Sequence, residues 1–157
     1  MRLWHKDLIP YLPRQQLIAQ WRECCAIAGS IAKKGTPNHL LVNKVLNYSS
    51  LHFHHYVSDV YEEMLKRGYK VSRKKAEEIS DLIILSDDYF PNETPAENKG
   101  EVFKNWHNNR YLLQCLANLS EKYDCGGISD AEWNVIKEAF PEQVKIIYSG
   151  DKEGNRL

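Results

Sequence analysis

The sequence lacks the features that would place it at once in a familiar class of proteins. No apolar stretch approaches the roughly 18 residues of a membrane-spanning helix, and the opening residues MRLWHKDLIP lack the pattern of an export signal. Motifs typical of nucleotide-binding proteins, serine hydrolases and zinc peptidases are also absent. We therefore expect a cytoplasmic protein that needs no cofactor.

Cysteine is scarce, and its spacing does not suggest cross-links. Only four cysteines occur, and Cys24 and Cys25 are adjacent, which does not suit a regular disulfide framework. We expect buried thiols, because cysteine usually behaves as a small hydrophobic side chain. His52 and His55 share one helical face, but nothing around them has the spacing of a zinc motif, so we expect no metal site.

The chain carries no net charge, but its charges are unevenly distributed. The basic half, residues 1–75, holds 13 Lys and Arg against 5 Asp and Glu, whereas residues 76–157 hold 8 against 16. The side chains of the basic half could bind the phosphate backbone of DNA. Alternatively, they could be solvated and partly neutralised by the acidic half, residues 76–147. The candidate DNA contacts are Arg2, Arg14, Arg22, Lys33, Lys34, Lys66 and Arg67.

Length and periodicity predict an all-α protein. With 157 residues, 43% of them hydrophobic, the chain is long enough for one core, and we expect a single compact multi-helix domain over residues 1–147 with a frayed tail over 148–157. Pro10 and Pro13 favour an extended or turn-rich N-terminal segment. Caps and apolar spacing predict helices over 13–33, 40–46, 51–66, 73–85, 95–121 and 130–140, with a loop over 87–92.

Glu23 lies in the middle of the first predicted helix and is the most informative candidate residue. Ala19, four residues before Glu23, and Ala26, three residues after it, lie on the same helix face and are small, so this face carries no bulky side chain next to Glu23. One interpretation is close helix packing with Glu23 in a structural ion pair. The other is a carboxylate that faces a ligand cleft, with Arg22 and Arg14 beside it to bind an anion.

Two segments resemble a known family. The first is Leu17-Ile18-Ala19-Gln20-Trp21-Arg22-Glu23 and the second is Met64-Leu65-Lys66-Arg67-Gly68-Tyr69. Both are similar to the pyrimidine-dimer DNA glycosylases, the endonuclease V-like enzymes, in which an aromatic-Arg-Glu triplet sits on a long helix near the chain start. The resemblance covers about residues 1–72.

The resemblance implies a helical DNA glycosylase that acts on a damaged or modified base in double-stranded DNA, with an abasic-site lyase step. Met1 would supply an N-terminal amine as nucleophile, since Arg2 is too large for removal of the initiator methionine. An α-amine is less basic than a lysine amine and is more often unprotonated at neutral pH. Glu23 would stabilise positive charge on the sugar and move protons, and Arg22 would bind a phosphate.

Two other functions stay open at this stage. Arg2, Gln16 and Ala26 stand where the resembled family has a small residue, a histidine and an arginine, which favours a non-catalytic helical DNA-binding module. Alternatively, the acidic half covers the basic half in a protein-interaction domain. For the glycosylase we expect a monomer whose partner is double-stranded DNA.

Overall fold

The computed structural model describes residues 1–92 and 101–149, and every regular element within these residues is a helix. This confirms the predicted all-α fold. Residues 1–5 are extended, and a short 3-10 helix, η1 (Lys6–Tyr11), follows them. Pro10 lies inside η1 and Pro13 precedes the first long helix, so the prolines keep this N-terminal segment out of regular α-helix.

The first three α-helices pack together. α1 (Arg14–Lys34) contacts both α2 (Ser50–Lys66) and α3 (Arg73–Leu85). α1 ends at Gly35, whose φ of 69° is the left-handed conformation that a helix end favours in glycine. Large side chains from these helices, Leu17, Phe53 and Ile83 among them, are buried in a common core.

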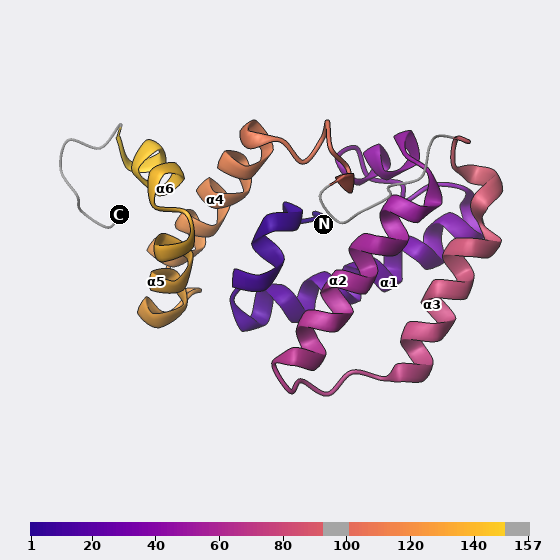
Figure 1. Ribbon diagram of the computed structural model, residues 1–157, viewed down its shortest axis with the longest axis horizontal. Helices are drawn as coiled ribbons and strands as arrows, with labels where there is room; N and C mark the ends of the chain where they lie inside the picture. The colour runs from indigo at the N-terminus through magenta and orange to yellow at the C-terminus, as the bar shows by residue number, and fades with distance from the viewer. Residues whose placement is uncertain (93–100, 150–157) are drawn as a thin grey trace.

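The second half of the chain forms a separate group of helices beside the first. α4 (Asn109–Asp124), α5 (Asp130–Ala139) and α6 (Pro141–Tyr148) lie at one end of the long axis, and α1 to α3 lie at the other (Figure 1). The N-terminal segment runs between the two groups, and η1 contacts both α2 and α5. Residues 6–11 are therefore in contact with both groups of helices.

Several predicted boundaries are confirmed by their caps. The Ser72 hydroxyl accepts a hydrogen bond from the Lys75 amide at the start of α3. Ser129 and Glu132 form both bonds of a capping box at the start of α5. These signals are readable in the sequence because the partners lie only three residues apart.

Other predicted boundaries are wrong. The stretch predicted over 40–46 is a 3-10 helix, η2 (Val42–Asn47), and the predicted loop contains the short η3 (Asp87–Tyr89). The long helix predicted to run to Glu121 is not continuous, since residues 102–108 form turns and bends and α4 begins only after the Asn108 cap. Its proposed cap at Thr94 lies outside the described residues.

The end of the chain also differs from the prediction. Pro141 stops α5 but also occupies the first turn of α6, a position that suits its fixed φ. The predicted frayed tail starts at Tyr148, which is the last residue of α6, and residues 150–157 lie outside the described residues.

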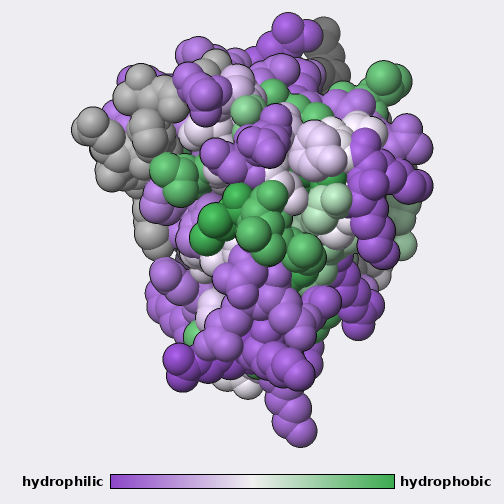
Figure 2. Space-filling model, turned by 90° about the vertical axis from the view of Figure 1, so that its right-hand side faces the viewer, coloured by the Kyte–Doolittle hydropathy of each residue, from purple (hydrophilic) through white to green (hydrophobic). Residues whose placement is uncertain are grey.

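The surface of the α3 side is polar with one apolar area. Figure 2 shows hydrophobic side chains gathered near the middle of this face, and α3 itself exposes Ile84 and Leu85 near its end. Within the described residues, no helix combines the length and the hydrophobicity that crossing a membrane requires.

Candidate active site

The extended first residues lie against the middle of α1, next to Glu23. The Arg2 amide donates a hydrogen bond to Glu23 Oε2 at 3.2 Å. Met1 precedes that amide and is half exposed. The chain's first amine is therefore one residue away from a direct contact with the carboxylate, on a part of the surface that solvent reaches.

Tyrosines from two other helices fix the backbone of the same segment. The Tyr56 hydroxyl, from α2, donates to the Trp4 carbonyl at 2.7 Å. The Tyr111 hydroxyl, from α4, donates to the Leu3 carbonyl at 2.6 Å. Both tyrosines are buried, so these bonds are shielded from water. The segment is thus held from both halves of the molecule.

A hollow of about 440 Å³ opens where this segment meets α1 and α4. It brings together both predicted catalytic residues with the side chain of Arg2. Two of its residues, Asn118 and Lys122, come from α4 and were not predicted. The residues that line it are Met1, Arg2, Trp4, Gln15, Gln16, Ala19, Glu23, Asn118 and Lys122.

The α4 residues could not be found by the resemblance, which stops well before them. Asn118 and Lys122 are four residues apart and therefore share one helix face, but nothing in the sequence says that this face meets Glu23. Lys122 matters chemically because it places a second amine at the hollow. Together with Arg2 it adds positive charge around a single carboxylate, which favours an anionic ligand.

Two buried thiols near the hollow are poor candidates for the nucleophile. Cys24 follows Glu23 in α1, and Cys115 Sγ lies 3.9 Å from the Arg2 guanidinium. Burial raises the pKa of Cys24 and that of Cys115, so both stay protonated at neutral pH. The expectation of buried thiols fits these two residues and is wrong for Cys125, which is exposed.

Several of the residues predicted to contact DNA lie on the surface of α1. Arg22, in the middle of the helix, is exposed, and so are Lys33 and Lys34 in its last turn. The Arg14 guanidinium sits over the Tyr69 ring at 4.7 Å, where it gains a cation-π contact. These side chains are available to an external phosphate, and their role in DNA binding stays a prediction.

Arg67 is placed differently from the α1 residues. Its Nε donates to Glu63 at 2.7 Å, and its terminal nitrogens donate to the carbonyls of Leu12 at 2.6 Å and Pro10 at 2.9 Å. The guanidinium therefore ties the end of α2 to the end of η1. These hydrogen bonds leave the Arg67 guanidinium few N–H donors for a phosphate.

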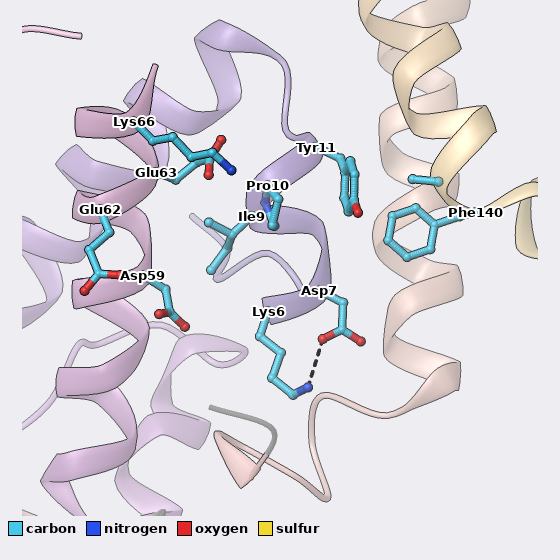
Figure 3. Close-up of a pocket in the computed structure, with 11 residues that line it drawn as sticks. Lys6, Asp7, Ile9, Pro10, Tyr11, Asp59, Glu62, Glu63, Lys66 and Phe140 are labelled. Atoms are coloured by element: carbon cyan, nitrogen blue, oxygen red, sulfur yellow. Dashed lines mark hydrogen bonds and ion pairs between the residues drawn. The ribbon is translucent and has the colours of Figure 1, made fainter. Parts of the chain in front are cut away.

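A second hollow, of about 630 Å³, lies between η1, α2 and the end of α5. Figure 3 shows carboxylates of α2 facing the ion pair in which Lys6 donates to Asp7 at 2.9 Å. Lys66, another predicted DNA contact, lines this hollow. Its acidic lining, Asp7, Asp59, Glu62 and Glu63, repels phosphate, so charge favours the smaller hollow at Glu23 as the DNA site.

Comparison with known proteins relates the first part of the chain to one family. A family model described as pyrimidine dimer DNA glycosylase matches residues 1–77, so this part of the chain is similar to that family of DNA glycosylases. The predicted resemblance is confirmed, and with it the general class of activity. No curated protein matches the chain. No solved structure matches it either.

Proposed function

We propose that this protein is a DNA glycosylase with abasic-site lyase activity, in which the Met1 amine is the nucleophile and Glu23 its partner. The observation that carries the proposal is the bond from the Arg2 amide to Glu23 Oε2, because it puts the chain's first residue beside the only carboxylate among the residues that line the hollow. The match of residues 1–77 to the glycosylase family model supports it.

The proposed reaction uses the amine lone pair. That pair forms a bond to the sugar C1′ while the bond from C1′ to the damaged base breaks, and the base leaves with the bonding electrons and takes a proton. The attached nitrogen then loses its protons and the sugar ring opens, with O4′ taking up a proton, to give a Schiff base. Removal of a C2′ proton next expels the 3′ phosphate and cuts the strand.

Glu23 serves two of these steps. Its carboxylate stabilises the positive charge that develops on the sugar as the base departs, and it accepts and returns protons during the elimination. One of its oxygens is bound by the Arg2 amide, which fixes the direction in which the carboxylate faces.

The basic half of the chain supplies the attraction for double-stranded DNA. Arg22 is one residue from Glu23 and exposed, so it is suited to bind a phosphate next to the reacting sugar. Lys33, Lys34 and Arg14 extend the positive surface along α1. Reaching a glycosidic bond in a duplex requires the nucleotide to be turned out of the stack, and these contacts offset part of that cost.

The first test is borohydride trapping on DNA that contains an abasic site, followed by mass mapping of the cross-linked peptide. Borohydride reduces a Schiff base to a stable amine, so the adduct marks the nucleophile. We expect it on Met1. Because Lys122 lines the same hollow, Lys122→Arg is the matched variant. It should form the adduct to the same extent as the unchanged protein. An adduct on Lys122 instead would refute the assignment to Met1.

One observation favours a second function, a DNA-binding module without chemistry. Glu23 Oε2 accepts bonds from the Arg2 amide and, at 3.4 Å, from Gln20 Nε2, as a purely structural carboxylate would. In that case the protein binds DNA with the salt dependence of phosphate contacts but neither releases a base nor forms an adduct. The trapping experiment separates the two functions.

A further inference from the structure

Gln20 is a buried polar side chain that the proposed chemistry does not use. It is fully buried in α1, one turn before Glu23. A buried amide needs partners for both its oxygen and its nitrogen, since each unpaired polar group loses its hydration without compensation. All the partners of Gln20 belong to the site or to its support.

The amide of Gln20 binds the extended segment as a neighbouring strand would. Its Oε1 accepts the Trp4 amide hydrogen at 2.8 Å, and its Nε2 donates to the Arg2 carbonyl at 3.0 Å. These two backbone groups flank Leu3 and face the same way. A single side chain therefore sets both the direction and the register of the first residues on α1.

The same amide reaches the proposed catalytic carboxylate. Gln20 Nε2 lies 3.4 Å from Glu23 Oε2, the oxygen that also accepts the Arg2 amide hydrogen. Arg2, Gln20 and Glu23 thus form a closed ring of hydrogen bonds. A shift of the segment by one residue would break both bonds that Arg2 contributes to this ring.

The partners of Gln20 determine which end of its amide is the oxygen, and Tyr56 lies beside that end. The Tyr56 hydroxyl donates to the Trp4 carbonyl at 2.7 Å and is 3.1 Å from Gln20 Oε1. Burial raises the pKa of Tyr56 well above its ordinary value, so it stays a neutral donor. Because the Trp4 amide can only donate, the side of the Gln20 amide that it meets must be the oxygen, and the nitrogen faces two acceptors, the Arg2 carbonyl and Glu23 Oε2.

We propose that Gln20 is a positioning residue. It keeps the Met1 amine and the Glu23 carboxylate oriented toward the same sugar atom, C1′, and does not itself contact DNA. The inference rests on the proposed function. A nucleophile and its partner act together only when their geometry is fixed before the substrate arrives, and a displacement of about 1 Å can lower a rate ~100-fold.

The first variant is Gln20→Met, which keeps the length of the side chain and removes its hydrogen bonds. We expect single-turnover cleavage of abasic-site DNA to slow ~100-fold, while the Kd for the same DNA changes less than about threefold, because Gln20 does not face solvent. Ile83→Ala is the matched control, since Ile83 is a buried residue of α3 outside the hollow. It should lower the melting temperature but leave the rate unchanged below that temperature.

The second variant, Gln20→Glu, is measured by its pH-rate profile, which would not change if Gln20 had only a structural role. A second carboxylate would then lie near Glu23, and two close carboxylates share a proton because both cannot ionise easily. We expect the acidic limb of the pH-rate profile to move to higher pH. In Gln114→Glu, made at an exposed residue of α4, the profile should stay in place.

The outcomes separate this inference from the proposed function. If the unchanged protein forms no adduct on Met1, both fail. If it does form the adduct and folded Gln20→Met cleaves at the same rate, only the positioning role of Gln20 is overturned. An unmoved pH profile in Gln20→Glu would count against the role in the same way.

Discussion

Two arginines that look equivalent in the sequence have different surroundings in the structure. Arg22 is exposed on α1 beside Glu23, whereas Arg67 is bound to Glu63 and to backbone carbonyls of η1 and the residue after it. Both were candidate DNA contacts, since both are basic and belong to segments that resemble the glycosylase family. Only their surroundings in the fold distinguish a side chain open to phosphate from one engaged within the protein.

The first prediction concerns Glu23. Glu23→Gln keeps the size of the side chain but removes the charge and the ability to accept a proton. We expect the rate of base release to fall ~100-fold or more, while DNA binding stays nearly intact. Single-turnover kinetics and a binding titration on one DNA measure the two effects. Glu138→Gln, at an exposed residue of α5, is the control, and equal rates in both variants would remove Glu23 from the mechanism.

The second prediction compares the two arginines. Arg22→Ala should weaken DNA binding and reduce the slope of log affinity against log salt by about 1, since one phosphate contact is lost. Arg67→Ala should instead destabilise the protein by ~1–3 kcal/mol, because it leaves partly buried carbonyls without donors. Salt titrations and urea unfolding measure the two. A reduced slope in Arg67→Ala with unchanged stability would reverse the assignment.

At the level of elements, the N-terminal segment depends on a pair of histidines. The rings of His5 and His107 are stacked with their centroids 5.2 Å apart, and His107 Nδ1 accepts the Lys6 amide hydrogen at 2.9 Å. His5 Nδ1 accepts the amide hydrogen of Asp7. Both rings must be neutral at these nitrogens to act as acceptors, so protonation would loosen the start of η1.

The third prediction follows from the pKa values of these histidines. Burial lowers the pKa of His107 well below 6.5, and it also lowers that of His5 although Asp7 opposes the effect. The folded state therefore binds fewer protons than the unfolded state just below pH 6.5. Stability is fully present above that pH and should fall as the pH drops toward the folded-state values.

Urea unfolding between pH 7.5 and about pH 5 measures this dependence, in a range where the carboxylates change little. His107→Gln keeps an acceptor at this position and should flatten the curve. His55→Gln is the control, because His55 is half-buried and lies outside the stack of His5 and His107. An equally steep loss of stability in His107→Gln would show that other groups cause it.

At the level of the whole molecule, α4 to α6 lie beside α1 and α2 (Figure 1), and the part of the acidic half that packs on α1 is α3. Lys33 and Lys34 stay exposed at the end of α1. This arrangement counts against the hypothesis that the acidic half covers the whole basic half. It leaves the protein with a positive end for DNA and a more negative end for solvent.

The fourth prediction tests this polarity. The double variant Lys33→Gln/Lys34→Gln should reduce the salt slope of DNA binding by about 2, because each phosphate contact contributes about one counterion. The matched double variant Lys137→Gln/Lys145→Gln removes the same charge from exposed positions in α5 and α6 and should leave the slope unchanged. Equal slopes in the two variants would indicate that only net charge matters.

The sequence by itself determined most of the helices, because the signals for them are local. Caps such as Ser72 and Ser129 bind amides three residues away, and the apolar spacing of α1 is visible within its own length. It also predicted the likeness of residues 1–77 to the glycosylase family and the presence of Glu23 and Arg22 on one helix. The start of α4 was misplaced because its cap, Asn108, is preceded by turns that apolar spacing does not reveal.

Only the tertiary structure decided how the site is assembled. The bond from Tyr111 to the Leu3 carbonyl joins residues 108 positions apart, and Asn118 and Lys122 reach the hollow from the same helix. Gln20 is an ordinary polar residue in the sequence and becomes the link between the N-terminal segment and Glu23 only in the fold. Contacts of this kind depend on how whole helices pack, and packing is set by the complete core rather than by neighbouring residues.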